Sequence, residues 1–256
     1  MWLYSASGLL VGLIVGMTGV GGGSLMTPIL VLLFGVSPVT AVGTDLLYAS
    51  ATKSVGSLVH GWGGTVRWRI AGLLMAGSVP AALLTVLALR WLDMPESRSG
   101  PLVSRLLGTC LILTALTILF RNRILRVADA GRTAMSERAQ AALTIVTGAA
   151  LGVLVTCSSV GAGAIGVTAL ILLYPRVPVA SIVGTDIVHA VPLTLVAGLA
   201  HAASGTVNGA VLLWLLGGSV PGIVVGSMVA PRADERLLRG VLAATLTIVG
   251  ARLVLV

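Results

Sequence analysis

The sequence predicts an all-α, polytopic transmembrane protein built from two copies of one unit. Composition is the first reason: of 256 residues, 57% are hydrophobic and 9% are charged, with a mean hydropathy of +1.07. A soluble domain has about 25% charged residues, so this chain has too few to cover a surface in contact with water. The second reason is that apolar stretches of bilayer-crossing length recur along the chain. An internal repeat is the third.

The repeat appears when the chain is compared with itself at an offset of 140 or 141 residues. The matching positions hold Gly, Pro, Thr, Asp and His, and not only Leu and Val. The clearest matches are Val20-Gly21-x-Gly23 with Val160-Gly161-x-Gly163, Gly43-Thr44-Asp45 with Gly184-Thr185-Asp186, and Gly77-Ser78-Val79-Pro80 with Gly218-Ser219-Val220-Pro221. Chance similarity between apolar helices does not produce such a series, so we interpret the chain as a duplication. The predicted organisation is membrane repeat 1 over 1–120, a basic cytoplasmic linker over 121–139 and membrane repeat 2 over 140–256.

Each repeat is predicted to hold a pair of short apolar segments followed by three longer ones. The pairs cover 5–18 with 21–34, and 141–157 with 160–174. A helix of about 14 residues reaches roughly 21 Å, less than the roughly 30 Å hydrocarbon core of a bilayer. Each pair is therefore predicted to be either a re-entrant hairpin or one discontinuous crossing. The longer segments cover 38–60, 66–91, 102–120, 178–201, 209–230 and 236–256.

The positions of the arginines favour hairpins, and hence two inverted repeats. With hairpins, each repeat crosses three times; 11 arginines then lie on the side of the linker and four on the other side. With discontinuous crossings the repeats run parallel, and the split is eight to seven. Because cytoplasmic connections are enriched in basic residues, we expect the inverted arrangement, although the outer loop 90–105 carries three arginines. The net charge of +8 comes from these connections, so nucleic acid is not an expected partner.

Glycine-rich turns inside the two pairs are the first candidate site. Residues 19–24 read Gly-Val-Gly-Gly-Gly-Ser, and residues 159–164 read Ser-Val-Gly-Ala-Gly-Ala. A helix that begins at such a turn offers free backbone N–H groups and the positive end of its dipole to an anion. Discontinuous helices of this kind form the substrate sites of many secondary transporters. The alternative is that the glycines only allow close helix packing, as we expect for Gly8, Gly12 and Gly16.

Lys53 is the second candidate, because it is the only lysine and lies within the apolar segment 38–60. A lysine in mid-membrane costs roughly 2.5–3.5 kcal/mol on insertion scales, so it should face a cavity or a partner. A cation near the glycine-rich turn would complete an anion site. The alternative is a lysine whose stem reaches toward the membrane surface. The second repeat has Thr194 at this position, so the charge is not duplicated.

Asp45 and Asp186 are candidates for proton coupling. Asp186 comes one helical turn before His189, and acid–histidine neighbours inside a membrane are typical of proton relays. The alternative is that each acid stabilises the start of a helix, with Thr44 or Thr185 as its cap. Cys110 and Cys157 lie in apolar segments, and no Cys or His cluster has metal-ligand spacing, so we expect neither a metal nor a cofactor.

Taken together, these residues resemble the TauE/SafE sulfite-exporter family of membrane permeases. The resemblance covers nearly the whole chain. It rests on Gly-Val-Gly-Gly-Gly-Ser-Leu-Met-Thr-Pro at 19–28, Ala41-x-Gly43-Thr44, His60 with Gly64-Thr65-Val66, Gly77-Ser78-Val79-Pro80, and the weaker copies in the second half.

The resemblance implies secondary transport of sulfur-containing oxyanions: sulfite, thiosulfate or organosulfonates such as sulfoacetate. Carried over by motif, the substrate contacts are Gly21, Gly22, Gly23, Ser24 and Thr44, with Gly161, Gly163 and Thr185 in the second half. Ser159 and Ala162 replace glycines in the second turn, which departs from the first. The expected location is the inner membrane of a bacterium, and the expected partners are a small anion and the lipid bilayer.

Two other classes stay open beside the transporter: a passive anion channel and a membrane-embedded enzyme. An intramembrane hydrolase needs a nucleophile with a positioned base. Ser24 and Ser158 lie in glycine-rich turns, but no nucleophile motif surrounds them, so we do not expect an enzyme. A homodimer is compatible with the sequence but not required by it.

Overall fold

The computed structural model describes residues 2–18, 23–62, 66–91, 96–130, 135–229 and 235–255, and its regular elements are helices. In chain order they are α1 (Trp2–Thr18), α2 (Gly23–Leu32), α3 (Pro38–Trp62), α4 (Trp68–Trp91), α5 (Glu96–Leu119), α6 (Arg121–Ala130), α7 (Glu137–Ser158), α8 (Ala164–Leu173), α9 (Val179–Ala203), α10 (Gly209–Val229) and α11 (Glu235–Leu255). Among the described residues, five stretches, in α4, α5, α7, α9 and α10, are long and apolar enough to cross a membrane. The predicted class, an all-α polytopic membrane protein, is confirmed.

The two members of the second short pair differ in length, where the sequence suggested similar ones. Helix α7 has 22 residues and α8 has 10. Helix α7 is longer because it begins inside the expected linker, where the Ser136 side chain caps it by accepting a bond from the Ala139 N–H, and α8 is shorter because it begins only at Ala164. Such caps satisfy the free donors of a helix start and extend it to a polar boundary. The first part of the expected linker is also helical, as α6.

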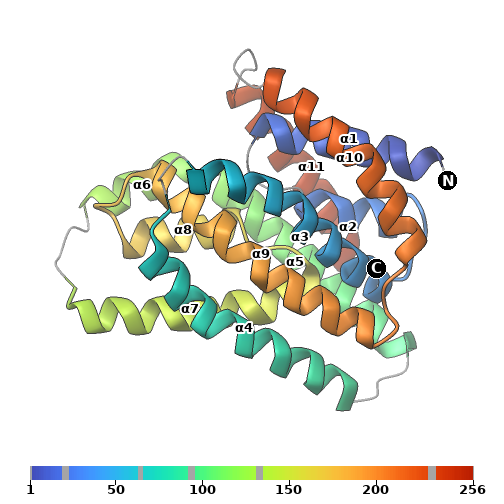
Figure 1. The fold of residues 1–256 in the computed structure, drawn as a ribbon, viewed down its shortest axis with the longest axis horizontal. Coiled ribbons are helices and arrows are strands. Elements are labelled where there is room, and N and C mark those ends of the chain that lie inside the picture. The colour runs from blue at the N-terminus through green and yellow to red at the C-terminus, as the bar shows by residue number, and fades with distance from the viewer. Residues whose placement is uncertain are drawn as a thin grey trace.

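The packing of the helices repeats the duplication seen in the sequence. Helix α1 lies along α10, and the equivalent α7 lies along α4 (Figure 1). A Cβ at Gly8 would run into the backbone of Leu215, and one at Gly148 would run into the backbone of Leu74, the equivalent pair. Glycine at these positions lets the helix backbones touch, as the expected packing role of Gly8 and Gly12 requires.

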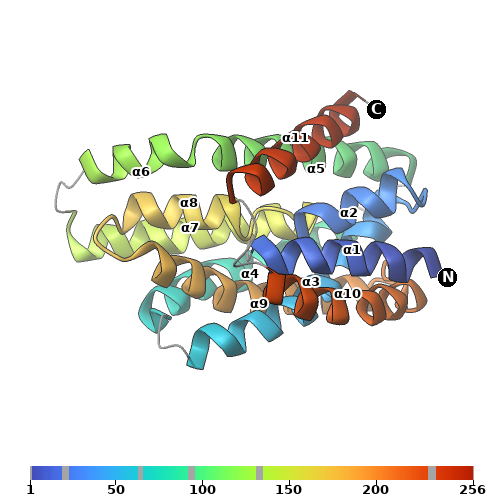
Figure 2. The same ribbon diagram turned by 90° about the horizontal axis from the view of Figure 1, so that it is seen from above.

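Equivalent helices of the two halves meet in antiparallel pairs at the centre. A Cβ at Gly43, near the start of α3, would lie 2.6 Å from the carbonyl oxygen of Thr206, just beyond the end of α9. A Cβ at Gly198, near the end of α9, would lie 2.7 Å from the Leu47 side chain. Helices α5 and α11 cross in the same way at Gly108 and Gly250 (Figure 2). These contacts place each of the two central helices, α3 and α9, against its counterpart in the other half.

Helix α8 folds back along α7. The Gln140 Nε2 atom donates a bond of 2.6 Å to the carbonyl oxygen of Leu173, and the Thr144 and Tyr174 hydroxyls lie 2.7 Å apart. These contacts join the first turns of α7 to the end of α8, so the turn between the two helices lies at the far end of the hairpin. The pair is thus a hairpin and does not continue as one straight crossing.

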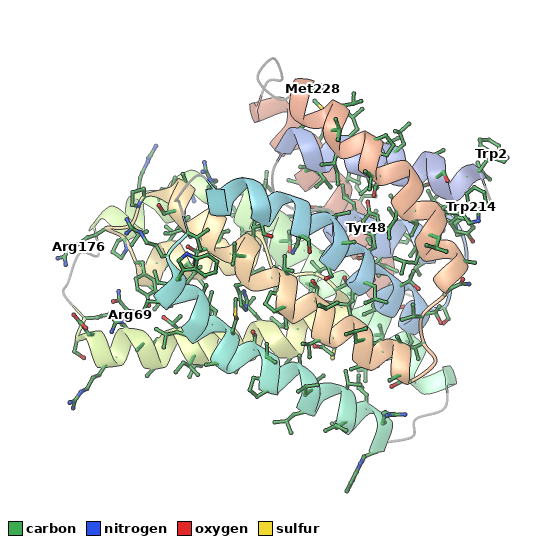
Figure 3. The ribbon with its side chains drawn as sticks, viewed as in Figure 1. Trp2, Tyr48, Arg69, Arg176, Trp214 and Met228 are labelled. Carbon is green, nitrogen blue, oxygen red and sulfur yellow. The ribbon has the colours of Figure 1, made fainter. Side chains whose placement is uncertain are left out.

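Charged and aromatic side chains mark the two ends of the helix bundle. Arg69 and Arg176 lie at one end, while Trp2 and Trp214 lie at the other (Figure 3). At the arginine end, Arg69 and Glu137 form an exposed ion pair of 3.3 Å between the starts of α4 and α7. Arginine and tryptophan are the side chains enriched where helices leave a bilayer.

Candidate functional site

Two acids, a lysine and a histidine are buried within α3 and α9. Asp45 and Lys53 come from α3, and Asp186 and His189 come from α9; Lys53 is the most accessible of them, at 7%. Buried ionisable groups are rare in apolar bundles unless they face a cavity or pair with one another. The antiparallel packing of α3 and α9 therefore brings together Lys53 and the three side chains that the sequence nominated for proton coupling.

Asp45 faces the short helix of its own half. The Thr27 hydroxyl of α2 donates a hydrogen bond to Asp45 Oδ2, while Oδ1 has no hydrogen-bond partner among the described side chains. Ser159, in the turn of the other half, lies close enough to act on the same carboxylate. Asp45 is thus held between the first short helix and the second turn.

Asp186 has the equivalent place against the other short helix. A Cβ at Gly166 of α8 would run into Asp186 Oδ1, so the absence of a side chain at Gly166 makes room for the carboxylate. Within the described part of the chain, Asp186 Oδ1 accepts no hydrogen bond. A buried oxygen of this kind carries a desolvation penalty until a proton or a ligand satisfies it. Both acids therefore have one oxygen free for such a partner.

Lys53 connects the first half to the turn of the second half. Its Nζ atom donates a hydrogen bond of 3.2 Å to the carbonyl oxygen of Ala162. The ammonium acts electrostatically on both Asp45 and Asp186. Among the described residues, the ion pair with a distance of 4 Å or less is that of Arg69 with Glu137. Lys53 therefore forms no ion pair with either acid. Its charge remains available to a third group.

The turn between α7 and α8 has a backbone that only glycine adopts easily. Gly161 has φ 119° and Gly163 has φ 129°, while Ser159 caps α7 in the left-handed region at φ 56°. The first helical bonds of α8 are made by the N–H groups of Gly166 and Val167. The backbone N–H groups at the beginning of α8 come before Gly166 in the chain. Backbone N–H groups at a helix start are the donors that an anion uses.

Thr44 of α3 and Thr185 of α9 each hold the start of a helix in the other half. The Thr44 hydroxyl accepts a bond of 3.0 Å from the Asn208 N–H, and the Thr185 hydroxyl accepts one of 2.9 Å from the Arg67 N–H. These two contacts are equivalent in the duplication and anchor the starts of α10 and α4. Both threonines therefore have a structural contact, and their contact with substrate stays a prediction.

The first turn is only partly described. Gly21 and Gly22 lie outside the described residues, and Gly23 and Ser24 form the first residues of α2. The side chain of His60 is likewise outside the description. His201, its counterpart, is satisfied structurally: its ring nitrogens lie 3.0 Å from the Thr206 hydroxyl and 3.1 Å from the Thr156 carbonyl oxygen.

The sequence reasoning did not nominate several polar residues of this region, among them Tyr48 and Ser78. Ser78 Oγ lies 2.9 Å from His189 Nε2, with both residues fully buried. The repeat itself carried the signal, because an offset of 141 residues places Tyr48 on His189 and Ser78 on Ser219. Thr27 and Ser159 have no such signal, since their counterparts are Val167 and Gly19.

A cavity of about 560 Å³ opens at the arginine end, between α4, α7 and the end of α8. Arg67, Trp68, Arg69, Gln140 and Tyr174 are among the residues that line it. The backbone of Arg67 binds Thr185, the neighbour of Asp186 in sequence. The cavity therefore lies near the first half of α9, the helix that also carries the buried Asp186.

Comparison with known proteins identifies the family. A family model described as "Sulfite exporter TauE/SafE" matches residues 4–253. Two similar proteins of Bacillus subtilis are the probable membrane transporter protein YjnA, 36% identical over 96% of this chain and 97% of the relative, and the probable membrane transporter protein YdhB, 26% identical over 94% and 95%. A probable membrane transporter protein of Xylella fastidiosa is 28% identical over 92% of this chain and 87% of the relative. No solved structure gives a significant match. The chain belongs to the TauE/SafE sulfite exporter family of membrane proteins.

Proposed function

We propose that this protein is a secondary transporter that moves small sulfur-containing oxyanions across the bacterial cytoplasmic membrane by alternating access. The substrate class is sulfite, thiosulfate or an organosulfonate such as sulfoacetate. The observation that carries the proposal is the contact between Lys53 and Ala162, which puts a buried cation on a glycine-rich turn at the start of a helix. The family membership supports transport, and the chemistry of the turn supports an anion.

The anion binds between the Lys53 ammonium and the amides at the start of α8. A tetrahedral or pyramidal oxyanion presents several acceptor oxygens, and backbone amides with a lysine supply matching donors. Binding replaces the Ala162 carbonyl as the partner of Lys53. The turn that contains Gly21, Gly22, Gly23 and Ser24 is the proposed counterpart in the first half, with Thr44 and Thr185 beside the two turns.

Asp45, Asp186 and His189 couple the movement to protons. A bound anion brings negative charge next to two buried carboxylates, and repulsion is removed when a carboxylate takes up a proton. The unpartnered oxygens of the two acids support this role. Asp186 is the favoured carrier, because Thr27 holds Asp45 while Asp186 lies one helical turn from His189.

The two halves lie inverted in the membrane, with the arginine end in the cytoplasm. Antiparallel packing of α3 on α9 and of α5 on α11 supports inversion, and the excess of arginine in the connections supports the orientation. Transporters with inverted repeats place their substrate site near mid-membrane, where the repeats meet. Rocking of one half against the other opens that site to each side in turn.

The test is flux in proteoliposomes containing the purified chain. Sulfite, thiosulfate, sulfoacetate, taurine and a simple carboxylate are compared with and without an imposed pH gradient. We expect saturable movement of one sulfur oxyanion that the gradient accelerates. Movement that fails to saturate indicates a channel and contradicts the carrier mechanism. If a folded sample moves none of these anions, the substrate class is wrong.

A further inference from the structure

Ser159 has a backbone conformation that favours glycine. It ends α7 with φ 56° and ψ 3°, in the left-handed region, and in the described part of the chain it is the non-glycine residue with a positive φ. Residues with a Cβ are uncommon in that region because the Cβ crowds the backbone that follows. Helices commonly end there with glycine, and the equivalent position of the first half is Gly19. The second half therefore has a serine where glycine would fit better.

The hydroxyl of Ser159 has no structural bond that explains the serine. The residue is 5% exposed, and its Oγ atom has no hydrogen-bond partner among the described residues. A buried hydroxyl without a partner carries an unrelieved desolvation penalty. Ser159 is thus unfavourable twice, through its backbone and through its hydroxyl. Residues with such unfavourable features cluster at ligand-binding sites, where the ligand supplies the missing partner.

The preceding serine shows the role that the turn itself gives to a hydroxyl. Ser158 Oγ donates a hydrogen bond of 2.6 Å to the Leu154 carbonyl oxygen and accepts one of 3.2 Å from the Val160 N–H. These bonds join the last turn of α7 to the residues that follow it. Because Ser158 makes them, the geometry of the turn requires nothing of the Ser159 hydroxyl.

Ser159 begins the turn that Lys53 contacts. Residues 159–163 read Ser-Val-Gly-Ala-Gly, so Ser159 carries the polar side chain of this turn. Three residues later, the Ala162 carbonyl oxygen accepts the hydrogen bond from Lys53 Nζ. The start of α8 follows directly, with its free backbone N–H groups. A hydroxyl, an ammonium and several amides therefore gather at this turn, and all of them are donors that an anion can use.

Asp45 is the rival partner of the Ser159 hydroxyl. Its carboxylate lies close to Ser159, yet Asp45 Oδ1 accepts no hydrogen bond from the described residues. A hydroxyl has one proton to donate, so it serves either this carboxylate or a bound anion. The two roles predict different results when Asp45 is replaced.

We propose that Ser159 is a substrate-contacting residue whose hydroxyl donates a hydrogen bond to the bound anion and selects sulfur oxyanions over carboxylates. Sulfite and a sulfonate group each present three oxygens around one sulfur, whereas a planar carboxylate presents two. Lys53 and the amides of α8 bind two oxygens of either kind of anion, and the Ser159 hydroxyl binds the additional oxygen of the sulfur group. The inference rests on the proposed function and adds to it a residue that determines specificity.

The test compares sulfoacetate with malonate, in which a carboxylate replaces the sulfonate group. Affinities are measured by calorimetric titration of the detergent-purified chain, and sulfite and thiosulfate are titrated beside them. Ser159→Ala should weaken binding of the sulfur oxyanions by roughly tenfold or more, the factor for one hydrogen bond to a charged group, and binding of malonate by less than about twofold.

Ser159→Gly separates the hydroxyl from the backbone strain. Like Ser159→Ala it lacks the hydroxyl, so it should lose the same preference for sulfoacetate over malonate. Glycine fits the left-handed conformation, so Ser159→Gly should melt at a higher temperature than Ser159→Ala. The matched control is Ser158→Ala, which removes a bonded hydroxyl of the same turn. It should lower the melting temperature and keep the preference for sulfoacetate.

A double mutant tests the rival role. In the Asp45→Asn background, Ser159→Ala should still weaken sulfoacetate binding by a similar factor, because the lost bond is to the anion. If the factor disappears there, Ser159 acts through Asp45 and the proposal is overturned. The proposal is also overturned if folded Ser159→Ala keeps the parent preference, or if Ser158→Ala loses it to the same extent.

Failure of the proposed function gives a different result. A parent chain that binds malonate as tightly as the three sulfur oxyanions, or binds none of the four anions, refutes the proposed substrate class and the Ser159 contact with it. A parent chain that prefers a sulfur oxyanion, with the same preference in Ser159→Ala, refutes the role of Ser159 alone.

Discussion

Lys53 and Ala162 are separated by 109 residues in the chain, yet the Lys53 Nζ atom donates a hydrogen bond of 3.2 Å to the Ala162 carbonyl oxygen. The cation of the first half therefore ends on the turn of the second half. This contact makes the site a single one that belongs to both halves, although the chain is a duplication. Its asymmetry follows from the sequence, because the position equivalent to Lys53 holds Thr194, whose hydroxyl bonds to the Ala190 carbonyl of its own helix.

Replacing Lys53 by Ala should weaken binding of the transported anion by tenfold or more, because the amides alone cannot balance its charge. Affinity is measured by equilibrium binding of the labelled anion to detergent-purified protein. Arg90→Ala is the control, since Arg90 is an exposed cation whose guanidinium bonds the Ala203 carbonyl at the end of α9. Unchanged affinity in Lys53→Ala would remove the lysine from the site.

Asp186→Asn should abolish the acceleration of flux by a pH gradient while leaving exchange of anion for anion intact. The amide has the shape of the carboxyl group but cannot carry a proton, and exchange requires no net proton movement. Asp45→Asn should reduce the acceleration less, because Thr27 already holds that carboxylate. Both fluxes are measured on the same proteoliposomes. Acceleration that survives in Asp186→Asn would assign the proton to another group.

Gly161→Ala should destabilise the turn and impair transport, even though space for a methyl group exists. The nearest atoms to a Cβ there are 3.8 Å away, so the effect comes from the backbone, whose φ of 119° strains any other residue by about 1–3 kcal/mol. Melting temperature and transport KM are the two readouts. Gly72→Ala is the matched control, because Gly72 has open space and no positive φ. Equal effects of the two changes would argue against a special role of the turn.

Thr44→Val and Thr185→Val distinguish a structural role from a substrate contact. Each change removes the acceptor of a backbone N–H at the start of a helix, at Asn208 or at Arg67. We expect a lower melting temperature, about 1 kcal/mol less stability, and a KM close to that of the parent. Thr→Ser at each position should restore stability. A KM raised tenfold at unchanged melting temperature would instead establish the substrate contact.

Arg67→Gln should raise the KM for anions arriving from the arginine end, and the effect should fade in high salt. Arg67 is one of the residues that line the cavity at that end, and a positive mouth concentrates anions through long-range attraction that salt screens. Transport is compared in the two directions at low and high ionic strength. A KM that rises equally for both directions would contradict a role at one entrance.

Much of the architecture was predictable because it depends on local pattern. The lengths of the apolar segments predicted the long helices, and the internal repeat predicted which helices of the two halves are equivalent. The small residues of α1 predicted close packing, which Gly8 shows, and Gly148 of α7 packs in the same way. Helix boundaries at polar positions were less predictable, since a single cap at Ser136 lengthened α7 into the linker.

By itself, the sequence determined the membrane class, the duplication, and the short set of polar residues that an apolar chain keeps in its interior. It could do so because composition and repeat spacing are properties of the chain alone. Only the tertiary structure decided which of these residues meet: Lys53 with the second turn, Asp45 with Thr27, and His189 with Ser78. Those contacts depend on how α2 packs on α3, how α4 packs on α9, and how the two halves meet, and the direction and register of each crossing are set by how whole helix surfaces fit together.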